Sequence, residues 1–182
     1  GLFYLLVVSS FLYFFLSKFT LEELASYEFI KNNRDYFFEL AEKFGEDFQT
    51  ETEDILNSLL FDAKRRGKMI IFSKKKLMHH FHLLDIRGTI RATLKVFKDD
   101  PDKYELLEPL GIACRYQYDI EDIEADLAAG YVNISQEDCA LFHILDEDLI
   151  APLSLKIKKW MHQRAKDGLE LLKEHHRRLH LG

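Results

Sequence analysis

Charged residues in the segment Leu110–Gly130 have a spacing that suits metal chemistry. If this segment is helical, a rotation of about 100° per residue brings positions three, four and seven apart onto one side. That side then carries Arg115, Asp119, Asp122 and Asp126. Like charges at these offsets destabilise a helix, and a divalent cation would remove the repulsion. Mg²⁺ prefers carboxylate oxygens and is commonly held by one or two carboxylates together with substrate phosphates.

This spacing predicts a magnesium–diphosphate site on one helix face. Asp119, Asp122 and Asp126 are the expected metal ligands. Arg115 and Asp119 are expected to assist at the diphosphate, Arg115 as a fixed positive charge. Bound metal neutralises the charge that develops on a departing diphosphate, which makes the diphosphate a good leaving group. The alternative interpretation is a solvated acidic helix face, which is the commoner meaning of such a pattern.

Helices must position these residues, because turn-forming residues are too few for a β-rich fold. The 182 residues include only three prolines and eight glycines. Thr20 and Glu23 form a capping box at one helix start. Glycines stand where helical patterns end, at Gly45, Gly67 and Gly130. From the apolar periodicity, the predicted helices are 2–17, 20–46, 49–66, 74–98, 102–129, 136–144 and 147–179.

Composition restricts the class of protein. The chain has 25 Lys+Arg against 31 Asp+Glu, and this net charge of −6 argues against a nucleic-acid binder. The hydrophobic content of 47% suffices for one domain over residues 1–182. Two isolated cysteines, Cys114 and Cys139, favour a reducing compartment, so we expect a cytoplasmic protein. The uncharged run Leu2–Leu16 is shorter than the roughly 20 residues that span a bilayer, which favours a buried core helix.

The acidic segment also resembles a known motif. The pattern LGxA from Leu110, followed by DxxxDxxxG from Asp122 to Gly130, resembles the second aspartate-rich motif of squalene and phytoene synthases. Proteins of that family have an all-α fold with a central cavity between helices. The resemblance implies that Asp122 and Asp126 are catalytic residues that bind the Mg²⁺ ions holding a prenyl diphosphate.

Other segments resemble the same family in the same order. Residues Ser58–Asp62, followed by basic residues, resemble the family's GMxxD segment, and residues 146–149 with the helix 156–179 resemble its closing region. The resemblance covers about residues 51–182, whereas residues 1–50 match weakly. It implies that Asp62 and Arg65 lie beside the diphosphate. Their spacing alone predicts only an ordinary helix ion pair, which is worth about 0.2–0.5 kcal/mol.

The chain departs from the family pattern at several positions. At four positions the family has glutamine, asparagine, arginine and glutamate. In the same order, this chain has Arg115, Tyr118, Glu121 and Ala125. Residues 1–50 contain only two aspartates, Asp35 and Asp47, and neither has a partner aspartate four residues later. The first aspartate-rich motif of the family is therefore missing from this segment. We expect a class I isoprenoid synthase-like helical bundle around a central cavity, incomplete at its N-terminus.

A second register is open for the same residues. Chain-elongating trans-prenyltransferases have the motif LGxxFQxxDDxxD. On this motif, Asp119 and Asp122 match the second and third aspartates, and Tyr118 replaces the first. The DxxxG segment that follows from Asp126 and the segment around Asp62 favour the squalene/phytoene register.

The predicted function is that of a prenyltransferase-like protein that acts on prenyl diphosphates with Mg²⁺, as squalene and phytoene synthases do. Catalysis would require that the missing metal motif be supplied. Two alternatives stay open, namely a chain-elongating trans-prenyltransferase-like enzyme and a non-catalytic helical scaffold or fragment of the family. The implied partner is a prenyl diphosphate, and its apolar chain leaves peripheral association with a membrane open as well.

Overall fold

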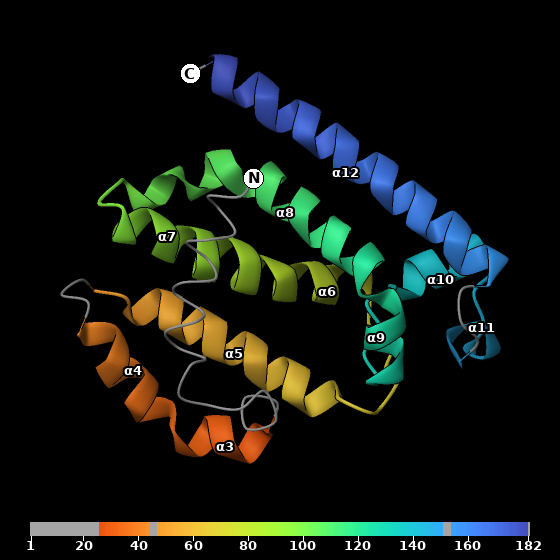
Figure 1. The fold of residues 1–182 in the computed structure, drawn as a ribbon, viewed down its shortest axis with the longest axis horizontal. Coiled ribbons are helices and arrows are strands. Elements are labelled where there is room, and N and C mark those ends of the chain that lie inside the picture. Colours follow the sequence, from red (N-terminus) through yellow and green to blue (C-terminus); the bar gives the residue numbers. More distant parts are fainter. Residues whose placement is uncertain (1–25, 44–46, 151–153, 182) are drawn as a thin grey trace. The chain divides into compact units, whose positions relative to one another are not determined.

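The computed structural model of the chain describes residues 26–43, 47–150 and 154–181 (Figure 1). These residues form helices, turns and loops, and they contain no strand, which confirms the all-α prediction. None of the described helices is long and apolar enough to cross a bilayer. The predicted helix 2–17, the capping box at Thr20 and the helix end at Gly45 lie outside the described residues.

Two compact units make up the chain. The first unit comprises Gly1–Lys64 and Leu83–Glu105, and the second comprises Arg65–His82 and Leu106–Gly182. The described helices that lie wholly or mainly in the first unit are α3 (Tyr27–Asn32), α4 (Arg34–Glu42), α5 (Gln49–Arg65), the π-helix η1 (His82–Ile90), α7 (Arg91–Val96) and the 3-10 helix η2 (Pro101–Lys103). Those of the second unit are α6 (Lys74–Phe81), α8 (Tyr104–Glu121), α9 (Ile123–Ala128), α10 (Gln136–Phe142), α11 (Asp146–Ile150) and α12 (Leu155–Leu181).

Apolar side chains and buried ion pairs hold the first unit together. Ile30, Phe37 and Leu56 form a core between the helices α3, α4 and α5. Glu51 is fully buried, and its two carboxylate oxygens lie 2.9 Å from Arg91 Nε and 2.8 Å from Lys95 Nζ. The single helix predicted over 20–46 is wrong within the described part, because a turn residue, Asn33, separates α3 from α4.

The π-helix lies inside the segment that the sequence predicted as one helix, 74–98. A Cβ atom on Gly88 would lie 2.6 Å from Ile55 Cγ1, so only glycine permits this close approach to α5. The Thr89 hydroxyl donates a 2.7 Å hydrogen bond to the carbonyl of Leu84, five residues earlier, as the wider turn allows. Local packing against α5 therefore accompanies the widened turn, which apolar periodicity alone does not predict.

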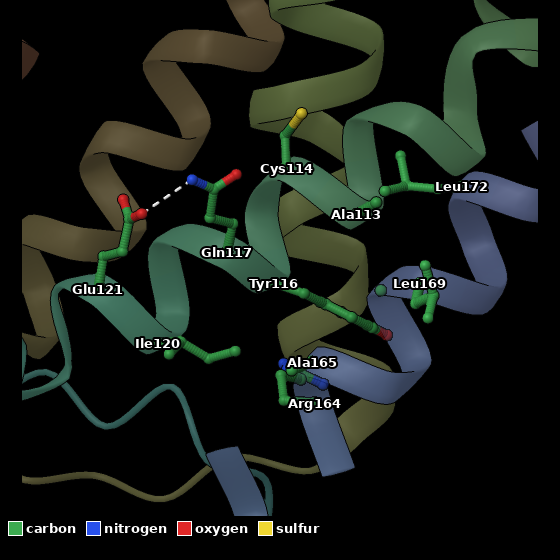
Figure 2. Close-up of a pocket in the computed structure, with 11 residues that line it drawn as sticks. Ala113, Cys114, Tyr116, Gln117, Ile120, Glu121, Arg164, Ala165, Leu169 and Leu172 are labelled. Carbon is green, nitrogen blue, oxygen red and sulfur yellow. Dashed lines mark hydrogen bonds between the residues drawn. The ribbon is translucent and has the colours of Figure 1, made fainter. Parts of the chain in front are cut away.

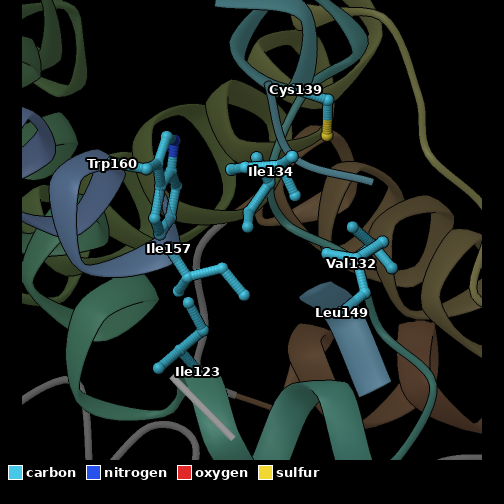
Figure 3. Close-up of a cluster of buried hydrophobic side chains, with 8 residues drawn as sticks. Ile123, Val132, Ile134, Cys139, Leu149, Ile157 and Trp160 are labelled. Carbon is cyan, nitrogen blue, oxygen red and sulfur yellow. The ribbon is translucent and has the colours of Figure 1, made fainter. Parts of the chain in front are cut away.

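The core of the second unit lies between α9, α10, α11, α12 and the segment 130–135 (Figure 3). Its largest member is Trp160, which is 2% exposed and donates from Nε1 to Asp138 Oδ2 at 3.2 Å. The buried residues of this cluster are Ile123, Val132, Ile134, Cys139, Ile144, Leu149, Ile157 and Trp160. Because each of these helices contributes at least one member, the cluster fixes where α9 and α12 stand.

Two glycines meet where α5 and α9 end. Gly67 and Gly130 have φ angles of 72° and 80°, a left-handed conformation that ends a helix, which confirms both predicted helix ends. The N–H of Tyr131 donates to the carbonyl of Asp126 and that of Gly130 to the carbonyl of Leu127, the two bonds of a Schellman motif. A Cβ atom on Gly130 would lie 2.3 Å from Gly67 Cα, so the two backbones are in direct contact.

Candidate functional site

The helix that carries the acidic residues is interrupted at Asp122. The sequence predicted one helix over 102–129, but Asp122 has φ −96° and ψ 2° and separates α8 from α9. Backbone bonds continue across the break, from Asp122 N–H to the carbonyl of Tyr118 at 2.9 Å and from Asp126 N–H to that of Asp122 at 2.8 Å. Figure 1 shows that α9 turns away from the axis of α8. Asp122 is exposed at this corner.

Asp119 lies between two arginines, each bonded to a different carboxylate oxygen. Arg115 contacts its Oδ1, with Nε at 2.9 Å and Nη2 at 2.8 Å. Arg164, on α12, donates from Nη2 to the other oxygen, Oδ2, at 2.9 Å. The side chain of Asp119 is 0% exposed and that of Arg164 is 6% exposed. These three residues, hereafter the Asp119 triad, form a buried ion cluster that joins α8 to α12.

Aromatic rings enclose the Asp119 triad. The guanidinium carbon of Arg164 lies 3.8 Å from the ring centre of Tyr116 and 5.3 Å from that of Trp160. That of Arg115 lies 4.8 Å from the ring centre of Phe81, on α6. Such rings attract a cation and exclude water from the ion pairs. The structure therefore gives Asp119 and Arg115 a role in holding the helices together.

The predicted set of three metal ligands is not assembled. Among the residues that the structure describes, no group of three His, Cys, Asp or Glu side chains is arranged to hold a metal ion. The physical reasons are the corner at Asp122 and the engagement of both Asp119 oxygens by arginines. Two carboxylates, those of Asp122 and Asp126, remain as candidate ligands.

Asp126 is half-buried at the start of α9. Its Oδ2 accepts a 2.8 Å hydrogen bond from Nδ2 of Asn133. Burial raises the pKa of Asp126 above its ordinary value, and the negative charges of Asp119 and Asp122 act in the same direction. The positive charges of Arg115 and Arg65 oppose this shift of the pKa. An ionised Asp126 is therefore less stable here than in water, and a bound cation would stabilise it.

Arg65, which the resemblance placed beside a diphosphate, is buried in the second unit. It is 4% exposed, and its Nη1 donates to the backbone carbonyl of Val132 at 3.3 Å. Its guanidinium carbon lies 5.1 Å from the ring centre of Tyr131. Asp62, its expected partner in the same site, belongs to the first unit and is half-buried.

Two residues of this region had no predicted role, namely Arg164 and Asn133. Arg164 is 45 residues from Asp119 and Asn133 is seven residues from Asp126, beyond a helix end. Helical spacing relates residues three or four apart, so it does not reveal such partners. The resemblance of the last helix to the family's closing region was the one signal near Arg164.

The two remaining carboxylates, those of Asp122 and Asp126, are of the kind that binds Mg²⁺ when water and substrate oxygens supply most of the other ligands. Asp122 is exposed and one helical turn from Asp126, whose ionised form benefits from a cation. One or two carboxylates are enough for Mg²⁺ when phosphate oxygens complete the shell.

No protein-family model matches the chain, and no curated protein or solved structure matches it.

Proposed function

We propose that this chain binds a prenyl diphosphate through Mg²⁺ held by Asp122 and Asp126, in a helical protein of the squalene/phytoene synthase type. The observation that carries the proposal is the half-buried Asp126, one turn from the exposed Asp122 and near two arginines. In this proposal the helices form an isoprenoid synthase-like bundle. Its location is the cytoplasm, where free cysteines such as Cys114 and Cys139 persist.

The choice between the two motif registers follows from Asp119. The chain-elongating register needs Asp119 and Asp122 as ligands, but both oxygens of Asp119 already accept hydrogen bonds from arginines. The squalene/phytoene register needs Asp122 and Asp126 and makes no use of Asp119. We therefore favour the squalene/phytoene register for the proposed ligand set.

Each residue has a defined part in the proposed binding. Asp122 offers an exposed carboxylate, and Asn133 orients the carboxylate of Asp126 through one oxygen. In this proposal the positive charge of Arg115, which opposes the upward shift of the pKa of Asp126, also favours the diphosphate. Bound Mg²⁺ would supply neutralisation of the diphosphate charge.

Calorimetric titration tests this proposal. Farnesyl diphosphate is titrated into the protein with Mg²⁺ and, separately, with EDTA. We expect binding only with Mg²⁺, and a loss of at least about tenfold in affinity for Asp122→Ala and for Asp126→Asn, since even outer partners of a metal have effects of that size. Glu124→Ala is the matched control, because it removes an exposed carboxylate from the same short helix. Equal binding in EDTA contradicts the proposal.

A non-catalytic scaffold is the second candidate function. The observation that favours it is the Asp119 triad, which uses charged residues of the acidic segment to join α8 to α12. A scaffold would bind neither Mg²⁺ nor farnesyl diphosphate, while Asp119 would still be needed for folding. Absence of any heat in the titration, with a folded protein, therefore supports this second candidate.

A further inference from the structure

A groove runs between α8 and α12 in the second unit (Figure 2), and neither Asp122 nor Asp126 is among the residues that line it. Its volume is about 380 Å³, within the range of about 300–1,000 Å³ for small-molecule sites. Small residues line it where the two helices approach each other, namely Ala113, Ala165 and Gly168. A Cβ atom on Gly168 would come no closer than 3.8 Å to a neighbour, so the groove has room at this point.

One end of the α8/α12 groove is apolar and open to water. Leu169 and Leu172 line it and are 53% and 43% exposed. They extend the apolar surface formed by Ile120 and the ring of Tyr116, and Figure 2 shows this ring pointing from α8 toward α12. Adjoining apolar side chains that remain half in water around a hollow are typical of a ligand-binding surface.

The other end of the groove holds Arg164. This side chain is 6% exposed and lines the groove, and its Nη2 donates to Asp119. Its Nε is buried and has no hydrogen-bond partner in the part of the chain that the structure describes. A buried guanidinium N–H without an acceptor is unfavourable, so an additional acceptor at this end would stabilise it.

Charge complementarity specifies what kind of acceptor fits. Asp119 is shared between two arginines, and Arg164 donates to it through Nη2, so its Nε is left for another acceptor. An anion beside Arg164 would accept from this N–H and pair with the guanidinium charge in a region of low polarity, where a charge-assisted hydrogen bond is strong. Glu121 lies at the rim of the groove, but it is exposed and accepts a hydrogen bond from Gln117 instead.

We infer that the α8/α12 groove binds a single apolar chain that ends in an anionic head group. The head group lies at Arg164, and the chain lies against Ile120, Leu169 and Leu172. This site shares no lining residue with the proposed Asp122 and Asp126 ligand pair. Its test is therefore carried out in EDTA, so that failure of the proposed metal site does not affect the result.

Fluorescence of Trp160 provides the measurement. This residue is the only tryptophan of the chain, and its ring centre lies 5.3 Å from the guanidinium carbon of Arg164. Dodecanoate and dodecanol have the same chain and differ in charge, and both are titrated below the solubility limit of dodecanol, where dodecanoate forms no micelles. We expect dodecanoate to bind at least tenfold more tightly than dodecanol. Equal affinities, or no binding of dodecanoate, would overturn the inference.

Matched variants locate the bound chain. Leu172→Glu places a charge in the groove, whereas Leu179→Glu places one at an exposed position of the same helix outside the groove. We expect a tenfold or greater loss of dodecanoate binding for the first variant and no change for the second. Gly168→Leu should also abolish binding by filling the groove, while Gly168→Ala, which meets only ordinary contacts, should retain it. An unchanged affinity in Leu172→Glu would place the ligand elsewhere and overturn the assignment.

Discussion

Replacement of Asp119 by alanine leaves two arginines of the second unit without their counter-ion. Arg164 is 6% exposed on its side chain and Arg115 is 16% exposed, so water cannot fully replace the lost carboxylate. Removal of one member of a buried ion cluster costs about 3–5 kcal/mol, because uncompensated charge stays buried. Since whole domains are stable by about 5–15 kcal/mol, this loss is a large fraction of the total. We therefore expect Asp119→Ala to unfold at much lower urea concentration.

Urea unfolding followed by Trp160 fluorescence measures this loss in the second unit, because that residue lies in its core and is the only tryptophan. Asp122→Ala is the control from the same acidic segment, and its exposed position predicts a change within about 0.5 kcal/mol. The opposite result, namely a more stable Asp119→Ala protein, would mean that repulsion among the acidic residues dominates. That result would refute the structural role of Asp119.

A second variant separates charge from packing at the same place. Simultaneous Arg115→Met, Asp119→Leu and Arg164→Met substitutions remove the ions and keep similar volumes. Apolar replacements of this kind are often neutral or stabilising for buried ion clusters. We therefore expect the triple variant to regain most of the stability that Asp119→Ala loses. Continued instability of the triple variant would show that the shape of the cluster, rather than unpaired charge, causes the loss.

Two further predictions concern Asp126 and Gly130. Burial raises the pKa of Asp126 above 3.8 in the folded protein, so the folded state binds this proton more tightly and loses stability as pH rises above about 3.8. Asp126→Asn should therefore be more stable than the parent at pH 7 and equal to it near pH 3 in urea unfolding; a less stable variant at pH 7 contradicts this. Gly130→Ala should lose at least about 1–3 kcal/mol from its positive φ, with a further loss from contact with Gly67, whereas Gly168→Ala should lose less in the same assay. Equal losses would contradict the close backbone contact.

Local signals predicted those elements whose boundaries have local causes. The helix predicted over 49–66 is observed as Gln49–Arg65, because apolar spacing defines it and Gly67 follows it in a left-handed conformation. The break at Asp122 could not be predicted in this way. Hydrogen bonds four residues apart continue on both sides of it, so the apolar period is preserved while the direction changes.

The sequence predicted which residues belong to the candidate site, but it did not predict how their side chains are arranged in space. Asp122 and Asp126 stand one turn apart, as their spacing requires. The sequence also placed the charges of Arg115 and Asp119 on the same helix face as Asp126, and both act on its pKa. The partner of Asp119 on α12 is 45 residues away, and its position depends on how the core around Trp160 packs. Spacing within one helix contains no information about that packing, so it assigned Asp119 to a metal.

The contact between Gly67 and Gly130 limits how the sequence can change over evolution. Neither residue presents a side chain to the other, yet each occupies space that a methyl group on its neighbour would need. The N–H of Gly67 donates to the carbonyl of Ala129 and that of Met69 to the carbonyl of Gly130, so insertions in either loop would also break this register. In an alignment of related chains, we expect these two columns to vary together and both loops to keep their lengths.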